Sequence, residues 1–258
     1  MSAAVPPFRL RWPHYVFAIL AYLVFLLAWA PASLLAWALP RASEQVAWLD
    51  QVDGTVWRGS AAALRLQPAT GAGQSLGQLN WRWQPLDLLR GRLGYRLSLG
   101  GAGIDAAGNV QVGPRGVALR ALRGEAPADW LGRLSPDLAM WQPQGRLLFE
   151  SEFLAFEKSA ITGRGTLRWV DAMSGHARDR LGTYRAELDG SDTGLAIKLS
   201  TESGALQLQG TGVWTPQRGL RFTGTARPAA GSATASVNFL GLLGPPQADG
   251  SRPIRIRR

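Results

Sequence analysis

Cysteine is absent from this chain of 258 residues, and histidine occurs only twice. Without cysteine the fold has neither disulfides nor thiolate metal ligands, so its hydrophobic core alone must hold it together. A Ser-His-Asp triad would have to use His176, because His14 borders a long apolar segment, and no G-x-S-x-G elbow between a strand and a helix presents a serine. Metal-binding, P-loop and dinucleotide-binding motifs are missing as well. The sequence therefore predicts a protein that is not an enzyme and that holds no cofactor or metal.

Two groups of carboxylates are the remaining candidates for chemistry. Glu150 and Glu152 would project from one face of a strand, about 6–7 Å apart, a separation compatible with acid–base catalysis by a hydrolase. They alternate with Phe149 and Phe153, which is typical of the solvated face of a strand, and this is the interpretation we favour. The segment Asp189–Asp192 resembles part of a calcium loop but lacks its glutamate. It predicts a hairpin turn.

Negative charge is scarce, since 28 Lys and Arg face 18 Asp and Glu and the formal net charge is +10. Much of the excess lies at the two ends, because residues 1–41 contain three arginines and residues 252–258 contain four, without any acidic residue. A nucleic-acid-binding surface would instead concentrate its basic residues on the folded domain. The charge pattern therefore argues against a nucleic-acid partner.

Residues 15–39 carry no charge, and as one helix they would exceed the ~30 Å of bilayer hydrocarbon. Arg9 and Arg11 precede this segment, and aromatic residues flank it at both ends, as in membrane helices. Pro31 is expected to kink the helix or to end its first part. The segment predicts a single transmembrane helix that contacts membrane lipid.

This topology divides the chain into a cytoplasmic stub (1–14), a membrane helix (15–39) and a periplasmic β-rich domain (40–258). It predicts a single-pass protein of a bacterial inner membrane, with the N-terminus in the cytoplasm. A cleaved signal peptide is the alternative, because Ala28–Ala30 and Ala36–Ala38 imitate an A-x-A cleavage site. The apolar run is longer than the usual h-region of about 7–15 residues, so we expect a retained anchor.

The rest of the sequence alternates apolar and polar residues, as half-buried antiparallel strands do. Leu93, Tyr95, Leu97 and Leu99, for example, alternate with polar or small residues. Short turns rich in glycine separate such runs and favour an antiparallel β-meander, either a twisted sheet or an open groove. The predicted strands lie near residues 55–67, 75–83, 92–100, 108–113, 116–123, 144–154, 161–170, 183–189, 195–201, 204–214 and 219–227.

Two short helices are predicted within the sheet domain, at Pro85–Arg90 and Pro127–Leu134. Ser43–Trp48 is expected to continue the N-terminal helix by a turn. A possible sub-boundary between two half-sheets falls near residues 124–143, which contain three prolines.

The edges of a meander that does not close must be protected or must accept a partner strand. We expect these edges at Thr55–Leu66 and at Pro253–Arg257, where alternating arginines protect the second edge. A partner is therefore expected on the first edge or on a surface that carries tryptophan.

Several short motifs follow one another in a fixed order. They are Gly54, Thr55, Val56, Trp57 and Gly59; Trp81, Trp83 and Pro85; Leu88, Leu89 and Gly91; and Trp169 with Tyr184. In this order and spacing they resemble the N component of bacterial type II secretion systems, the GspN family, over essentially the whole chain. As side chains they suit a scaffold, with Gly54 and Gly59 in turns or bulges and Trp57 filling the core between them.

The resemblance implies an accessory, non-catalytic inner-membrane component that helps export folded proteins from the periplasm. It implies contacts with inner-membrane platform subunits or with the outer-membrane secretin. An AsmA-like envelope protein, whose β-groove carries or shields lipid, is the alternative, and it requires an apolar face without polar interruption. The tryptophans are interpreted as core residues, with a partner surface as the alternative. Outside the anchor and its flanks they are Trp57, Trp81, Trp83, Trp130, Trp141, Trp169 and Trp214.

Overall fold

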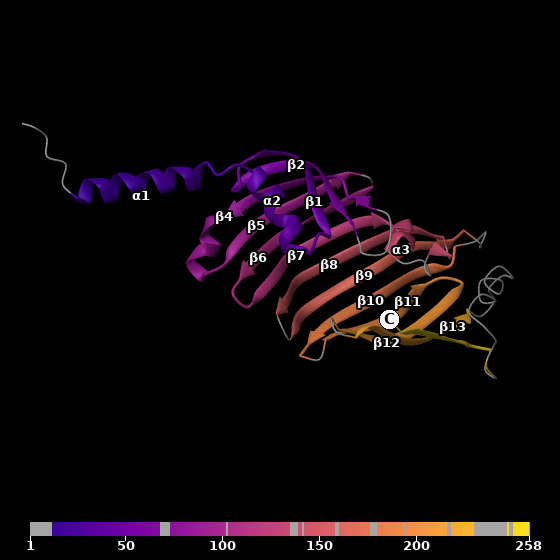
Figure 1. Ribbon diagram of the computed structural model, residues 1–258. Helices are drawn as coiled ribbons and strands as arrows, with labels where there is room; N and C mark the ends of the chain where they lie inside the picture. Colours follow the sequence, from indigo (N-terminus) through magenta and orange to yellow (C-terminus); the bar gives the residue numbers. More distant parts are fainter. Residues whose placement is uncertain are drawn as a thin grey trace, which may run out of the picture.

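The computed structural model describes residues 12–67, 73–101, 103–134, 139–140, 142–157, 160–175, 180–192, 194–215, 218–229, 247 and 250–257 (Figure 1). Its helices are α1 (Trp12–Ala28), α2 (Ser33–Ala42), the 3-10 helix η1 (Pro85–Arg90) and α3 (Asp129–Leu134). Its strands are β1 (Ala47–Gly54), β2 (Arg58–Leu66), β3 (Gln74–Ser75), β4 (Gln78–Gln84), β5 (Leu93–Gly101), β6 (Ile104–Gly113), β7 (Gly116–Pro127), β8 (Pro143–Glu157), β9 (Ile161–Ser174), β10 (Gly182–Ser191), β11 (Gly194–Ser203), β12 (Leu206–Thr215), β13 (Gly219–Pro228) and β14 (Arg252–Arg257).

One 14-stranded sheet contains all of these strands, and every pairing in it is antiparallel. Each strand pairs with the next along the chain, except that β3 lies off the path beside β2. Figure 1 shows a long twisted sheet with β1 and β2 at one end, β12 and β13 at the other, and α1 projecting away. The predicted mainly β, antiparallel meander is confirmed.

The apolar N-terminal segment forms two helices. α1 ends at Ala28, and α2 begins at Ser33 after a break that contains Pro31. The proline was expected to kink the helix or end its first part, and it does the second. Within the described part of the chain, no helix combines enough length with enough apolar character to cross a membrane. α2 instead packs beside β1.

The first strand was placed wrongly from the sequence. Ser43–Trp48 was expected to be helical, but α2 ends at Ala42 and the chain then turns through positive φ angles at Glu44 and Gln45. β1 follows directly and forms the first edge, so β2 lies between β1 and β4 and the edge predicted at Thr55–Leu66 is interior. The error arose because Asp50 and Asp53 disfavour a strand by propensity.

The remaining strand predictions agree with the structure to within a few residues, and the edge predicted at Pro253–Arg257 is β14. Pro85–Arg90 is helical as predicted, in the 3-10 form, and the helix predicted at Pro127–Leu134 is α3. β7 and β8 are paired in a single register, from the pair of Gly116 and Glu157 to the pair of Pro127 and Arg146. The sub-boundary near 124–143 therefore falls between two strands of one sheet and stays a prediction.

The pairing register separates an apolar face from a polar face, because directly opposed residues project to the same side. One row of opposed residues crosses the whole sheet, and its members are Val52, Ala61, Leu79, Leu99, Ala106, Gly124, Phe149, Leu167, Ala186, Leu199, Gly210, Gly224 and Ile254. The row beside it projects to the other side and contains Ser60, Asn80, Ser98, Ala107, Arg123, Glu150, Thr166, Glu187, Lys198, Thr211, Thr223 and Arg255. The sheet is therefore amphipathic along its full length.

Candidate functional site

The turn between β1 and β2 is joined to the end of α1. The contacts are backbone hydrogen bonds from Val56 to Ala30 (2.9 Å) and from Ala32 to Gly54 (3.1 Å), a β-bridge between Pro31 and Thr55, and a bond from the Trp57 indole N–H to the Leu27 carbonyl (2.7 Å). The last carbonyls of a helix have no partner within the helix, and the indole satisfies one of them. We call segments 27–32 and 54–57 the junction.

Three tryptophans surround the junction. The rings of Trp57 and Trp83 lie 4.5 Å apart between centroids, and the backbone N–H of Trp83 donates to the Trp57 carbonyl at 2.7 Å. Trp81 is buried, and its indole N–H donates to the Thr55 carbonyl at 3.0 Å. Trp57 is half-buried, so it packs against its neighbours and also reaches the surface.

The motif glycines of this region permit close approach. Gly54 has a φ of +93°, where a side chain would be strained, so it ends β1 in a turn. Gly59 lies under Trp81, because a Cβ at Gly59 would lie 2.5 Å from the ring of Trp81. The junction cluster is formed by Ala32, Ala61 and Trp81, against which Leu35, Leu49, Val52, Leu79, Tyr95 and Leu97 pack.

η1 carries the next motif residues outward. Pro85 starts the helix, and Gly91 ends it with a φ of +67°. The side chains of Leu88 and Leu89 are 54% and 85% exposed, and Leu86 between Pro85 and Asp87 is 73% exposed. The structure therefore does not place these leucines in the core.

A second core cluster lies between β9 and β14. It contains Ala172, Leu181, Tyr184, Leu206 and Ala226, with Trp169, Leu199, Leu208 and Ile254 packed against it. The rings of Trp169 and Tyr184 are 5.9 Å apart, the Tyr184 hydroxyl donates to the Leu206 carbonyl at 3.1 Å, and the Trp169 indole donates to the Gln144 carbonyl at 2.9 Å. Burial raises the pKa of Tyr184, so this hydroxyl stays protonated and remains a donor. The motif residues thus lie in three places, at the junction, on η1 and in the second core cluster.

The other residues considered for chemistry are not assembled into a site. Glu150 and Glu152 are exposed on β8, where the pairing with β9 is irregular between Glu150 and Phe153. Among the described residues there is no group of three or more His, Cys, Asp or Glu that could hold a metal. Trp130 is buried and Trp214 is half-buried. His176 and Trp141 lie outside the described residues.

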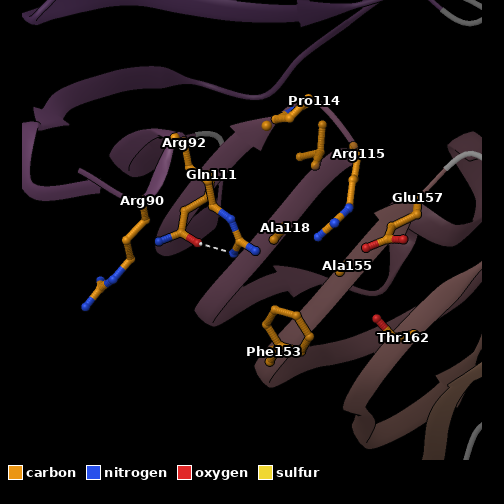
Figure 2. Close-up of a pocket in the computed structure, with 14 residues that line it drawn as sticks. Arg90, Arg92, Gln111, Pro114, Arg115, Ala118, Phe153, Ala155, Glu157 and Thr162 are labelled. Atoms are coloured by element: carbon orange, nitrogen blue, oxygen red, sulfur yellow. Dashed lines mark hydrogen bonds between the residues drawn. The ribbon is translucent and has the colours of Figure 1, made fainter. Parts of the chain in front are cut away.

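One feature that the sequence interpretation missed is a basic hollow of about 380 Å³ on the polar face beside η1 (Figure 2). Arg90, Arg92 and Arg115 line it together with Gln111 and Glu157. Figure 2 shows the side chains of Arg115 and Glu157 directed into the hollow and that of Arg90 directed away from it. The short run Arg90-Gly91-Arg92 after an exposed apolar helix was the signal that could have indicated it.

The fold and the junction define an antiparallel sheet protein whose apolar N-terminal helix is fixed to the first turn of the sheet. The chain belongs to the family described as "Type II secretion system (T2SS), protein N", which matches residues 45–255. Over 251 residues it is 31% identical to the Aeromonas hydrophila protein named "Type II secretion system protein N", covering 93% of this chain and 94% of that protein. No solved structure matches. The family assignment made from the motifs is confirmed.

Proposed function

We propose that this chain is a non-catalytic component of the type II secretion system, fixed in the inner membrane and working in the periplasm by contact with other subunits. The family match over residues 45–255 carries this proposal, because it includes every strand from β1 onward except the last residues of β14. Segment 27–32 of the junction lies before the matched residues. The proposed partners are inner-membrane platform subunits or the outer-membrane secretin. The role we assign is to help folded proteins leave the periplasm.

The surface of α1 supports the proposed anchor. Its large apolar side chains, from Trp12 to Leu27, are 49–81% exposed and cover all sides of the helix. A helix that is apolar all round needs an apolar environment. α1 has 17 residues and is roughly 25 Å long at ~1.5 Å per residue. This is slightly shorter than the ~30 Å of bilayer hydrocarbon, a mismatch that a bilayer accommodates by thinning. Arg9 and Arg11 favour a cytoplasmic N-terminus.

The edge strands support action by contact. The outer edge of β1 presents backbone groups that another strand can pair with, which is a common mode of recognition. β14 is less suited to pairing, because Pro253 lacks an N–H and arginines alternate along the strand. We therefore place a partner on β1 or on the exposed part of the junction.

Deletion of the gene tests the proposal. Exported proteins are expected to accumulate, folded, in the periplasm, and expression of the full chain should restore their release. The double variant Glu150→Gln, Glu152→Gln and the single variant His176→Ala should restore it equally at normal abundance. Loss of release in either variant would favour an enzyme, and unimpaired secretion after deletion would reject the proposal.

Topology is tested separately. A reporter that is active only in the periplasm should work when fused after Arg258. Activity of a cytoplasmic reporter at the same position would reverse the proposed orientation. A mature protein that starts near Pro31 or Leu39 would show that the N-terminal segment is cleaved.

The apolar face favours one second function, the carriage or shielding of lipid. Its row from Val52 to Ile254 contains only apolar residues and glycine. Most of its large side chains are half-buried rather than covered. Mass spectrometry of lipids copurified with the full chain tests this function. Altered outer-membrane lipid composition with normal secretion in the deletion strain would support it over the first proposal.

A further inference from the structure

Strands β1, β4 and β6 finish on the same side of the sheet, and this end of the strands carries α1, η1 and the turn between β6 and β7. The Trp57 indole binds the last turn of α1, the Trp57 carbonyl binds Trp83, and η1 begins two residues later at Pro85. The start of β5 is opposed to the end of β6, so the β6–β7 turn lies at this end too. Figure 1 shows α1 leaving the sheet on the side where β4 leads into η1. We call the part of this end formed by residues 85–93, 112–117 and 156–157 the rim.

Apolar side chains are unusually exposed along the rim. Leu93, Val112, Val117 and Phe156 are opposed in register across β5 to β8 and form one row. They are 44%, 44%, 37% and 37% exposed, although the next residues of the same face, inward from the rim, are half-buried or buried. Leu86, Leu88 and Leu89 on η1 add exposed apolar side chains to the rim, with 54–85% exposure. Exposed apolar side chains gathered at one place mark a surface that contacts a membrane or a protein.

Positive charge lies directly beside this patch. Arg90 is largely exposed and contacts Asp87 at 3.8 Å, while Asp87 itself is buried. Arg92 donates to the Gln111 amide oxygen at 3.4 Å, and Arg115 has no ion-pair partner among the described residues. Glu157 is the exposed carboxylate of this group. The rim thus presents leucines and, next to them, a basic hollow.

We propose that the rim lies on the surface of the bilayer, with the η1 leucines in the interfacial region and Arg90, Arg92 and Arg115 bound to the phosphates of anionic lipid headgroups. The inference rests on the proposed anchoring of α1, because a membrane helix held by the junction brings this end of the sheet to the bilayer. Leucine on one side and arginine on the other is the composition of interfacial membrane-binding segments. Guanidinium groups also match phosphate oxygens in geometry. The rim would fix the orientation of the whole sheet relative to the membrane.

The absence of cysteine makes the test direct, because single cysteines can be labelled in the full chain. The variants Leu89→Cys, Leu20→Cys and Met140→Cys place an environment-sensitive fluorophore on η1, on α1 and beyond the opposite end of the sheet. Met140 is the matched control, since it is apolar and 69% exposed. Each labelled protein is reconstituted in vesicles that contain nitroxide-labelled lipid, made of phosphatidylcholine alone or of an equimolar mixture with phosphatidylglycerol.

Quenching at position 89 should exceed quenching at position 140, and phosphatidylglycerol should increase it. If positions 89 and 140 are quenched equally while position 20 is strongly quenched, the rim inference is overturned and the anchor stays intact. An unquenched position 20 would instead reject the proposed anchor. Inorganic phosphate added at constant ionic strength should not reduce the quenching at position 89. A reduction would show that the hollow binds free phosphate rather than lipid headgroups.

The charge requirement is tested by replacing Arg90, Arg92 and Arg115 together with glutamine in the Leu89→Cys protein. In mixed vesicles the ratio of docked to undocked rim should fall by about fivefold for each arginine removed, as expected for arginine near an anionic surface. The control replaces Arg123, Arg146 and Arg227, which lie on the polar face outside the rim. An equal decrease in the control, or no decrease in the rim variant, would overturn the role of the arginines.

Discussion

The junction cluster and the second core cluster use the same side-chain types for different purposes. In both, aromatic rings pack together and donate to backbone carbonyls, with bonds at 2.7–3.1 Å. At the junction the bond of Trp57 spans 30 residues and fixes a helix to the sheet, and the bond of Trp81 spans 26 residues and holds the turn between β1 and β2. In the second cluster Tyr184 is 2% exposed and joins strands of the sheet itself. The first cluster positions the helix, and the second stabilises the sheet.

The largest effect is expected in the second cluster. Tyr184→Ala should lower the free energy of unfolding by about 3–5 kcal/mol, because it removes a buried ring and leaves a cavity. Tyr184→Phe, the matched control, keeps the ring and should lose about 1 kcal/mol with the bond to Leu206. Urea unfolding in detergent measures both. Equal losses for the two variants would show that the hydrogen bond rather than packing dominates.

The next largest effect is expected for Gly59→Ala, which acts on the junction cluster. The new methyl group would collide with the Trp81 ring and the Asp53 carbonyl, so we expect a loss of about 1–3 kcal/mol from overpacking. Gly91→Ala serves as the control, because nothing lies within 4 Å of its Cβ position. Its cost should be the backbone strain at positive φ alone, about 1 kcal/mol. A Gly59 variant as stable as the wild type would mean that Trp81 moves freely.

Trp57→Phe sharpens the distinction between positioning and stability. Trp57 is half-buried, so the free energy of unfolding should change by about 1 kcal/mol, the value of one hydrogen bond. Hydrogen exchange at residues 27–32 should nevertheless rise clearly, because Leu27 loses its indole donor. Exchange near Tyr184 is the internal control and should not change. If both regions exchange faster, the two clusters are coupled and the comparison fails.

The smallest effect is expected on the polar face of the strands that carry the second core cluster. Arg168 and Arg185 are directly opposed, and Glu202 contacts both, at 2.7 Å and 2.8 Å. The hydrogen bond from Arg168 lowers the pKa of Glu202 below its ordinary value, against partial desolvation, and the charges of both arginines add to this. Stability from this contact is present above the unfolded pKa of the carboxyl and is lost as pH falls through the lower folded pKa.

The contact is solvent-exposed, so acid should reduce the unfolding temperature slightly more in the wild type than in Glu202→Gln. Differential scanning calorimetry across the acid range measures this difference. The same acid sensitivity in both proteins would remove Glu202 as its source.

Local sequence signals predicted most of the fold and few of the contacts at the junction. Alternation located the strands, Pro85 and Gly91 bounded η1, and Pro31 ended α1, since each acts on the backbone of its own segment. β1 was missed because pairing with β2 overrides the weak strand propensity of its aspartates. The bond from Trp57 to Leu27 could not be predicted, since the two residues are far apart in the chain. The exposure of Leu88 and Leu89 likewise depends on the direction in which η1 leaves the sheet.

The meander has a consequence for how the sheet comes apart. Because each strand pairs mainly with its neighbours in sequence, the structure is nearly one-dimensional, and its stability is close to a sum of neighbouring interfaces. β14 has 6 residues, whereas β8 and β9 have 15 and 14. Opening can therefore start at the β14 end, with strands detaching in order toward the long central pair. The turn between β1 and β2, which the junction joins to α1, would keep its contacts with the helix while the strands near β14 open.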